Sequence, residues 1–456
     1  MGQNDLDPRA ERPVRDLDEL AEVFRAVEKP KDRWRVGAEA EKFGVAHDGR
    51  PLQYDGEHGV LRVLDHLVSS HAWKPSGETE GGPVISLGRG MGSITLEPGA
   101  QLELSGAPSD SIHQICAELD EHMRELADIS SEMGLAWLGV GFHPFARQED
   151  LPWVPKARYG IMKRYLPTRG PGALDMMRRT ATVQANLDFS SEEDAMTKLR
   201  ICLVLAPLIN AMTANSPFKE GKLAGKKSVR GEVWLHMDPS RSGLIGQLWS
   251  KPVLRYRDYV EWALDAGMFL VKRGDEVVAN TGQTFRDFMQ NGFQGHHATF
   301  ADWKLHVNTL FPEARIKSTF EVRPCDSLSG ELACAVPALY TGLLYDDVAM
   351  AKAAAFAQTF RLDEVERARP ELVHAGLGAQ IGSRSARELA VELLDIARSG
   401  LRARARKDAE GRDETIYLEK LATLNESGRS PADLLTEGLS GNEPDLRARI
   451  LERCRV

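Results

Sequence analysis

Five glutamates lie in three segments that are expected to form strands, and their spacing indicates metal chemistry. Glu39 and Glu41 lie in GAEAEKFGV, Glu97 and Glu103 in ITLEPGAQLELSG, and Glu321 in STFEVRP. Residues two apart on a strand project from the same face. Carboxylates gathered on one face repel each other unless cations lie between them. Because hard divalent ions prefer oxygen ligands, the pattern predicts a site for Mg²⁺ that also holds substrate phosphates.

The two acids of ITLEPGAQLELSG, residues 94–106, are placed by the geometry of a predicted hairpin. A three-residue loop, residues 98–100, puts Glu97 opposite Gln101 and Thr95 opposite Glu103, with the apolar side chains on the other face. A two-residue loop would put Glu97 on the same face as Leu102, which is a poorer pattern. We therefore expect Glu97 and Glu103 diagonally on one polar face, roughly 7 Å apart at the backbone.

For each acidic pair alone, the alternative is a strand face in contact with solvent. The metal site is favoured because three separate strand-like segments each bring acids on the polar side. Amide and guanidinium side chains accompany them, namely Gln184, Asn186, Arg179 and Arg323. The glycine-rich stretch GGPVISLGRGMG, residues 81–92, could approach a phosphate through its N–H groups. It lacks the ending of a P-loop and the context of a dinucleotide fold, so a tight turn is its alternative.

Helices and alternating strands that position these residues are mixed along the chain without a βαβ rhythm. Helical spacing covers residues 14–28, 57–70 and 110–133, whereas residues 182–189 and 319–323 alternate with a period of two. Residues 385–401 open with Ser385 and Glu388 in capping-box spacing, and residues 413–437 continue a helical region. We predict an α+β fold with a largely antiparallel sheet backed by helices. Residues 1–380 would form the catalytic domain, and residues 381–456 a helical region packed on it or continuous with it.

Composition limits the class of protein. The chain has 456 residues and a formal net charge of −9, which argues against a broad nucleic-acid footprint. Its longest apolar runs look too short to span a bilayer, and its polar, acidic start is unlike a targeting segment, so we predict no membrane contact and a cytoplasmic protein. We expect a monomer or a homodimer. Five scattered cysteines without a CxxC pair indicate neither a zinc knuckle nor a dense disulfide scaffold.

A colinear series of motifs resembles the plant-type glutamate–cysteine ligase family of plants and many bacteria. It runs from about residue 33 to residue 437 and comprises GAEAEKFG, SITLEPGAQLELSGAP, GFHPFARQEDLPWVPKARYGIMKRYLP, LDMMRRTATVQANLDFSSE, ANSPFKEG, SVRGEVW, FEVRPCD and LLYDD. The resemblance implies a fold like glutamine synthetase, in which a curved, mainly antiparallel sheet forms an active-site funnel backed by helices. It implies that ATP phosphorylates the γ-carboxylate of L-glutamate and that the amine of L-cysteine displaces the phosphate, which is the first step towards glutathione.

The resemblance also implies roles for individual residues. The predicted Mg²⁺ ligands are Glu39, Glu41, Glu97, Glu103 and Glu321. The predicted catalytic groups are Arg179, Arg230 and Arg323, because a planar guanidinium suits carboxylate and phosphate oxygens. Gln184, Asn186 and Trp234, again with Arg230, would line the substrate side. The partners would then be small molecules alone: glutamate, cysteine and ATP as co-substrate.

Two departures from the family pattern leave alternatives open. Glu232 stands where the family usually has a histidine, two residues after Arg230, and Arg178 stands where an apolar residue is common. A ligase that joins glutamate to a different amine is therefore one alternative. A catalytically silent protein that binds the nucleotide or amino acid is the other.

Cys116 and Cys334 match two positions that plant members of the family join in a redox-sensitive disulfide. The alternative is two reduced, packed thiols, which a reducing cytosol favours. Geometry decides whether the two sulfur atoms can meet.

Overall fold

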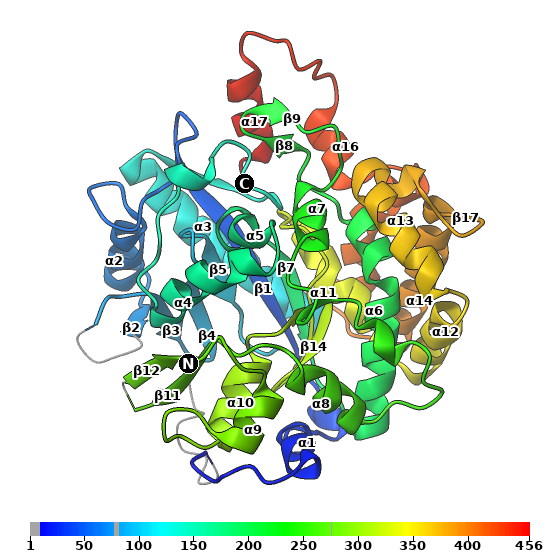
Figure 1. Ribbon diagram of the computed structural model, residues 1–456. Coiled ribbons are helices and arrows are strands. Elements are labelled where there is room, and N and C mark those ends of the chain that lie inside the picture. The colour runs from blue at the N-terminus through cyan, green and yellow to red at the C-terminus, as the bar shows by residue number, and fades with distance from the viewer. Residues whose placement is uncertain (1–9, 77–81, 275) are drawn as a thin grey trace.

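A large antiparallel sheet organises the computed structural model, which describes residues 10–76, 82–274 and 276–456 (Figure 1). These residues form a nine-stranded sheet with the order β14-β15-β7-β1-β5-β4-β3-β2, and β6 pairs with the other end of the long strand β1. Its strands are β1 (Val36–Ala46), β2 (Lys74–Ser76), β3 (Ser86–Arg89), β4 (Gly92–Leu96), β5 (Leu102–Ser105), β6 (Leu135–Leu138), β7 (Val183–Leu187), β14 (Ala314–Ile316) and β15 (Phe320–Val322). The predicted α+β class with an antiparallel sheet is confirmed.

Helices surround this sheet. Those encoded in the first half of the chain are α1 (Leu17–Arg25), α2 (Val60–Ser70), α3 (Ile112–Met133), α4 (Ala157–Tyr165), α5 (Ala173–Arg179) and α6 (Glu192–Met212). Those that follow are α7 (Val229–Leu235), α8 (Tyr256–Leu264), α9 (Phe285–Asn291), α10 (Phe300–Val307), α11 (Glu331–Leu344), α12 (Asp347–Ala357), α13 (Leu362–Ala375), α14 (Ala386–Arg404), α15 (Glu419–Glu426), α16 (Pro431–Thr436) and α17 (Leu446–Cys454). Helices α3 and α11 pack against β1, whereas α4, α5 and α10 lie in front of the sheet in Figure 1.

Short elements complete the described chain. The two-stranded ribbons are β8 (Phe218–Lys219) with β9 (Lys222–Leu223), β10 (Ser242–Gly243) with β13 (Phe311–Pro312), β11 (Leu270–Arg273) with β12 (Glu276–Ala279), and β16 (Gln380–Ile381) with β17 (Arg384–Ser385). The 3₁₀ turns are η1 (Lys31–Arg33), η2 (Gln148–Asp150), η3 (Leu166–Thr168), η4 (Gly246–Leu248), η5 (Gly376–Gly378) and η6 (Glu414–Leu418). The glycine-rich stretch forms the β3–β4 hairpin, where Gly90 takes a positive φ of 59°, which supports the tight-turn alternative. Residue 81 lies outside the described residues.

Helix α3 shows how the sequence pattern specifies local structure. Its N-cap, Ser111, accepts a hydrogen bond from the Gln114 N–H, and Gly134 ends the helix in the left-handed conformation. Ile112, Ile115 and other residues three and four apart are buried against the sheet. The helix predicted for residues 110–133 is therefore confirmed, because cap and apolar stripe agree.

The C-terminal region shares the main hydrophobic core. Leu389, Leu393 and Leu401 of α14 belong to the same buried cluster as the strands. Ser385 is the N-cap of α14, but its side chain makes no capping hydrogen bond, so the predicted capping box with Glu388 does not form. The division of the chain near residue 380 stays a prediction.

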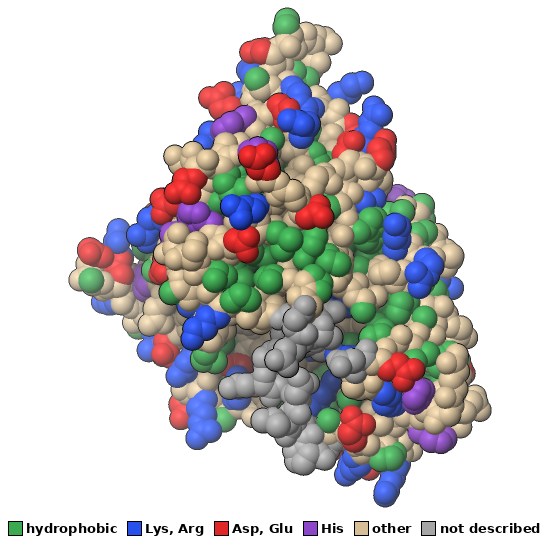
Figure 2. Space-filling model, turned by 90° about the vertical axis from the view of Figure 1, so that its left-hand side faces the viewer, with side chains coloured by type: hydrophobic (Ala, Val, Ile, Leu, Met, Phe, Trp, Pro, Cys, Tyr) green, Lys and Arg blue, Asp and Glu red, His purple; other side chains and the backbone are tan. Residues whose placement is uncertain are grey.

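Helix α6 is the buried central helix of the fold. By length and composition alone it could cross a membrane, which corrects the expectation that every apolar run is too short. However, 89% of its most apolar window is buried inside the protein, as expected of a core helix. Figure 2 shows positive and negative side chains interspersed over the described part of one face, with hydrophobic side chains near its middle.

Buried histidines give this fold a predicted acid sensitivity. His306 is buried, its Nε2 lies 2.8 Å from the Ala263 carbonyl oxygen, and burial lowers its pKa to about 3. The unfolded chain binds a proton near pH 6.5, so this stability is present above that pH and is lost as the pH falls. We expect the free energy of unfolding to fall by on the order of 3 kcal/mol per such histidine by pH 4.

Urea unfolding of His306→Gln checks this expectation between pH 7 and pH 4. Glutamine can still donate to the Ala263 carbonyl oxygen but does not titrate in this range. The variant should lose less stability over this interval than the parent chain. His58→Gln, at an exposed position, should follow the parent curve. The prediction is contradicted if the free energy of unfolding falls equally with pH in His306→Gln and in the parent chain.

Candidate active site

The β4–β5 hairpin places its acids as the sequence predicts. Thr95 pairs with Glu103, the Glu97 N–H donates to the Gln101 carbonyl oxygen at 2.9 Å, and residues 98–100 form the loop. The Gln101 side chain donates to the carbonyl oxygen of Thr180 at 2.9 Å, which ties the loop to the end of α5. The predicted three-residue register is confirmed.

Glu41, which is partly buried, and Glu103, which is buried, face each other across neighbouring strands. They are direct partners in the β1–β5 register. Burial, followed by repulsion from Glu103 and Glu97, raises the pKa of Glu41 well above its usual value. Burial, with repulsion from Glu39 and Glu97, raises the pKa of Glu103 to about 8. These carboxylates are therefore crowded: the nearby Arg230 and Arg323 at Glu41, and Lys156 at Glu103, offset the effect of burial and repulsion only in part. A divalent ion stabilises carboxylates under this condition.

The other two predicted metal ligands already have partners. Glu39 accepts a hydrogen bond from the Asn186 side chain at 2.8 Å. Glu321 is fully buried and is ion-paired with Arg315 at 2.7 Å and with Lys317 and Arg323. Burial alone would raise the pKa of Glu321, but these three cations outweigh it and hold that pKa well below its usual value. A metal role for Glu39 and Glu321 stays a prediction.

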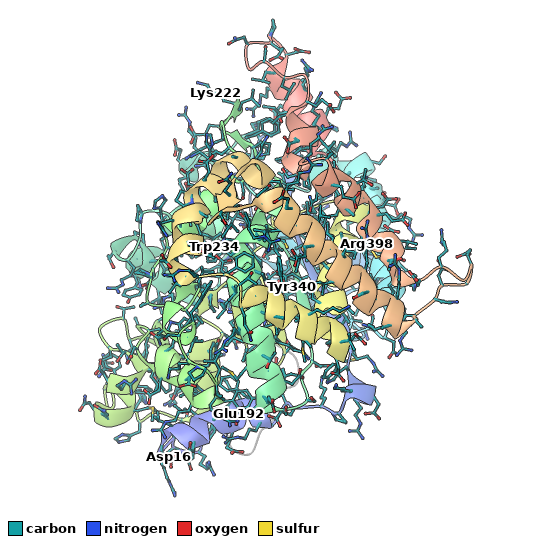
Figure 3. All side chains as sticks on the ribbon, turned by 90° about the vertical axis from the view of Figure 1, so that its right-hand side faces the viewer. Asp16, Glu192, Lys222, Trp234, Tyr340 and Arg398 are labelled. Carbon is teal, nitrogen blue, oxygen red and sulfur yellow. A yellow bond between two sulfur atoms is a disulfide. The ribbon has the colours of Figure 1, made fainter. Side chains whose placement is uncertain are left out.

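Two arginines lie beside the acids. The Arg230 guanidinium donates to the carbonyl oxygens of Arg323 at 2.8 Å and Pro324 at 3.0 Å, and lies 5.6 Å from the Trp234 ring centroid. Arg323 donates to the side-chain oxygen of Gln184 at 2.9 Å and also lies over Trp234. The Nε atoms of Arg230 and Arg323 have no hydrogen-bond partner among the described residues. The sequence predictions therefore converge here, with Trp234 near the middle of the molecule (Figure 3).

Arg179 lies in a different environment. It pairs with Asp175 and Glu220, each at 3.3 Å, and its guanidinium lies 4.5 Å from the Phe142 ring centroid. Its neighbour Arg178 donates to the Gln148 side chain and the Leu151 carbonyl oxygen. Neither arginine is among the residues that line the cavity next to Glu41. Contact of Arg179 with a substrate stays a prediction.

A cavity of about 120 Å³ connects the acids with the arginines. Glu41 and Glu97 line one part of it, and Arg230, Arg323 and Trp234 another. Sequence analysis missed several lining residues: Gln101, Arg158, Tyr159, Met162, Met176, Met177, Thr182, Asn308, Thr309 and Phe311. Arg158 lies in the quoted motif PKARYGIM, which was the available signal, whereas residues 305–311 lie outside every quoted motif.

The residues around the cavity fit a metal ion whose coordination shell is completed by water and substrate oxygens. As placed, no three carboxylate, imidazole or thiol groups among the described residues form a ready-made metal site. Magnesium normally takes one or two protein carboxylates and completes its shell with water and substrate phosphate oxygens. The paired carboxylates of Glu41 and Glu103, with Glu97 close enough to raise both of their pKa values, match that donor set.

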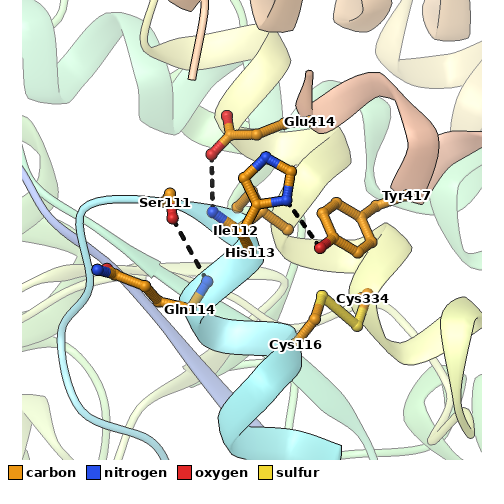
Figure 4. Close-up of a disulfide and its surroundings, with 8 residues drawn as sticks. All are labelled: Ser111, Ile112, His113, Gln114, Cys116, Cys334, Glu414 and Tyr417. Carbon is orange, nitrogen blue, oxygen red and sulfur yellow. Dashed lines mark hydrogen bonds between the residues drawn. A yellow bond between two sulfur atoms is a disulfide. The ribbon is translucent and has the colours of Figure 1, made fainter. Parts of the chain in front are cut away.

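Cys116 of α3 and Cys334 of α11 are joined in a disulfide, with 5.7 Å between their Cα atoms (Figure 4). This differs from the alternative of two reduced thiols that a reducing cytosol favours. At the start of α3, the Ile112 N–H donates to Glu414 at 2.7 Å, and His113 contacts the Tyr417 hydroxyl at 2.9 Å. The η6 turn therefore packs beside the disulfide. A redox role for the pair stays a prediction.

The fold and cavity together define an α+β enzyme that gathers anionic groups. Acidic side chains and guanidinium groups line the same cavity, a combination that suits phosphoryl transfer. The family model "Glutamate-cysteine ligase family 2" matches residues 35–449. A chloroplastic glutamate–cysteine ligase of Medicago truncatula is 38% identical over 413 residues, covering 90% of this chain and 79% of the relative. The chain therefore belongs to glutamate–cysteine ligase family 2.

Further comparisons agree. The chloroplastic glutamate–cysteine ligase B of Oryza sativa subsp. japonica is 39% identical, covering 89% of this chain and 80% of the relative. The solved glutamate–cysteine ligase of Francisella tularensis in complex with AMP has a TM-score of 0.54 at 14% identity, covering 92% of this chain and 87% of that one, which supports the fold alone. The predicted family, enzyme class and reaction are confirmed: the chain is an ATP-dependent ligase for γ-glutamylcysteine formation, the first step of glutathione synthesis.

The predicted cytoplasmic location is wrong by these comparisons. The plant relatives from Medicago truncatula, Oryza sativa and Arabidopsis thaliana are all named as chloroplastic enzymes. That prediction was based on composition and on the polar, acidic sequence of residues 1–20. Neither property determines the compartment in which a folded enzyme works.

Proposed function

We propose that the acidic part of the cavity holds Mg²⁺ through Glu41, Glu97 and Glu103. Glu39 and Glu321, the other two predicted ligands, join them only when Asn186 and the three cations around Glu321 release them. Mg²⁺ held by these residues would supply positive charge that stabilises phosphate oxygens during phosphoryl transfer. The observation that carries this proposal is the pairing of Glu41 with Glu103 across neighbouring strands, where the two carboxylates repel each other beside two guanidinium groups.

The arginines then bind the amino-acid substrate. Arg230 and Arg323 present unbonded Nε–H groups next to the acids and can hold the γ-carboxylate of glutamate while it receives the phosphoryl group. The same two side chains stabilise the charge on the γ-glutamyl phosphate and on the phosphate that leaves. Gln184 orients Arg323, Asn186 orients Glu39, and Trp234 covers both guanidinium groups.

Cysteine is the amine that the proposal assigns to the reaction. Its nitrogen attacks the carbonyl carbon of the γ-glutamyl phosphate, and the C–O bond to the phosphate breaks. Glu232, which motivated a different acceptor, is ion-paired with Lys226 and does not line the cavity. Met162, Met176 and Met177 do line it, and such soft, polarisable side chains suit a thiol. For the assembly state, a monomer or a homodimer is proposed.

Release of ADP tests the reaction and its metal requirement together. We expect ADP only when glutamate, cysteine and Mg²⁺ are all present, with loss of at least about tenfold of the rate in excess EDTA and recovery on adding Mg²⁺. The γ-glutamylcysteine formed should equal the ADP released. Magnesium should also raise the melting temperature, because binding to the folded state stabilises it. ADP release that is unchanged without glutamate, or with EDTA, would refute the proposal.

A further inference from the structure

A fully buried carboxylate behind Arg230 forms a hydrogen-bonded junction that the reaction described above does not use. Asp326 follows β15 and has no exposed surface. Its carboxylate accepts hydrogen bonds from the Asn215 N–H at 2.8 Å, the Ser216 hydroxyl at 2.6 Å and the Ser228 hydroxyl at 2.9 Å. It also lies 3.8 Å from Nη1 of Arg230. Three segments distant in sequence therefore meet at one buried negative charge.

Two of these contacts control the helix that carries Arg230. Ser228 is the N-cap of α7, and its hydroxyl oxygen accepts from the Gly231 N–H at 2.8 Å. The Ser216 hydroxyl oxygen accepts from the Arg230 N–H at 3.2 Å. Because Asp326 accepts from both hydroxyl groups, it fixes their orientation and so the start of α7.

The segment around Asp326 also holds the guanidinium itself. The two carbonyl oxygens that accept from Arg230 belong to Arg323 and Pro324, three and two residues before Asp326. The Asn210 side chain donates to the same Pro324 oxygen at 2.8 Å. Backbone and guanidinium of Arg230 are thus oriented by one short stretch of chain, residues 323–326.

This stretch reaches the acidic part of the cavity as well. The Ser327 hydroxyl donates to the Glu41 carbonyl oxygen at 2.6 Å, and the Ser327 N–H donates to the Ala181 carbonyl oxygen at 3.0 Å. The backbone that carries Glu41 is therefore connected to the backbone that holds Arg230. There is little room for movement, because a Cβ atom on Gly141 would lie 2.4 Å from Cγ of Asp326.

We propose that Asp326 is a positioning residue for glutamate binding: its buried negative charge fixes the guanidinium of Arg230 in direction and distance relative to Glu41. This inference rests on the proposed role of Arg230. Buried groups behind a binding residue typically change affinity or activity by about 10–100-fold when they are altered. We expect an effect of this size for Asp326, because its charge lies within 4 Å of the buried Arg230 guanidinium and little solvent screens their interaction.

The variant Asp326→Asn keeps the shape of the side chain and removes its charge. We expect the KM for glutamate to rise by about tenfold, with a smaller change in the KM for ATP and in kcat. Asp194→Asn is the matched control, because Asp194 is also a buried carboxylate that accepts from a serine N–H and hydroxyl group and pairs with a cation, Lys198, at the start of α6. Its KM for glutamate should stay within about twofold of the parent value.

A double-mutant cycle with Arg230→Lys separates positioning from general loss of structure. If Asp326 acts through Arg230, Asp326→Asn should change the KM for glutamate by less than about twofold in the Arg230→Lys background. Ser216→Ala, a milder change at the same junction, should show the same non-additivity and serves if Asp326→Asn folds poorly. If the two substitutions multiply the KM for glutamate independently, the inference is overturned but the proposed function is not. An Arg230→Lys enzyme with unchanged glutamate kinetics would overturn both.

Discussion

Glu41→Gln is expected to lower kcat/KM by about a thousandfold, equivalent to about 4 kcal/mol of barrier. The neutral side chain keeps its size and can still accept the Thr182 N–H, which Glu41 binds at 3.0 Å. It cannot supply the negative oxygen that binds a divalent cation next to phosphate oxygens. Steady-state ADP release over a range of Mg²⁺ concentrations measures the loss, which raised Mg²⁺ should only partly restore.

The same substitution should stabilise the metal-free protein. Burial and repulsion from Glu103 raise the pKa of Glu41, so removing its charge relieves an unfavourable interaction. We expect the free energy of unfolding near pH 8 to rise by about 1 kcal/mol. A loss of activity together with a gain in stability indicates a functional carboxylate, because replacement of a structural carboxylate would lower both activity and stability.

Glu118→Gln is the control for both measurements. Glu118 is another partly buried carboxylate with a raised pKa and accepts a backbone N–H, that of Ala107, at 3.0 Å. It lies outside the cavity, so its replacement should change kcat/KM by less than about twofold. The metal proposal fails if Glu41→Gln retains a tenth or more of the parent activity at saturating Mg²⁺.

Local rules were sufficient for the strands and for the acids that they carry. The register that places Thr95 opposite Glu103 follows from loop length and side-chain alternation, both properties of one short segment. That Glu41 lies opposite Glu103 is a different kind of fact, because it depends on which strands become neighbours in the sheet. The alternation of side chains along each strand predicts that both acids lie on a polar face, but it does not predict that β1 pairs with β5.

The charged partners of Glu321 and Arg179 were not predicted from the sequence. Glu321 was grouped with the metal ligands by strand parity, but the β14–β15 hairpin places Arg315 directly opposite it, and Lys317 pairs with it as well. Arg179 was aligned by its motif, yet Glu220, 41 residues later, pairs with it. Residue type and spacing indicate that a charge is present, whereas the partner of that charge depends on strand pairing and on loops that have no periodic signal.

Arg230→Lys is expected to lower kcat/KM for glutamate by about a hundredfold, and Arg230→Ala by about a thousandfold. Lysine keeps the charge but loses the planar fork, so its three donors on one nitrogen cannot reproduce the bidentate contact with an oxyanion while the two carbonyl oxygens stay bound. In the parent chain Nη1 and Nη2 of Arg230 each donate one N–H to the carbonyl oxygens of Pro324 and Arg323, which leaves the second N–H of each and the Nε–H for a substrate. Glutamate titrations at saturating ATP and cysteine measure the loss, which should fall mainly on the KM for glutamate in the lysine variant.

Arg241→Lys distinguishes this loss from the removal of any buried arginine. Like Arg230, Arg241 is buried, donates to backbone carbonyl oxygens and lies over an aromatic ring, that of Phe269, at 4.1 Å. It pairs with Asp238 at 3.0 Å and does not line the cavity. Its replacement should lower stability without a selective rise in the KM for glutamate, because the lost interactions are structural. Equal glutamate defects in the two lysine variants would mean that Arg230 also acts through the fold, and the anion-binding role assigned to it would be lost.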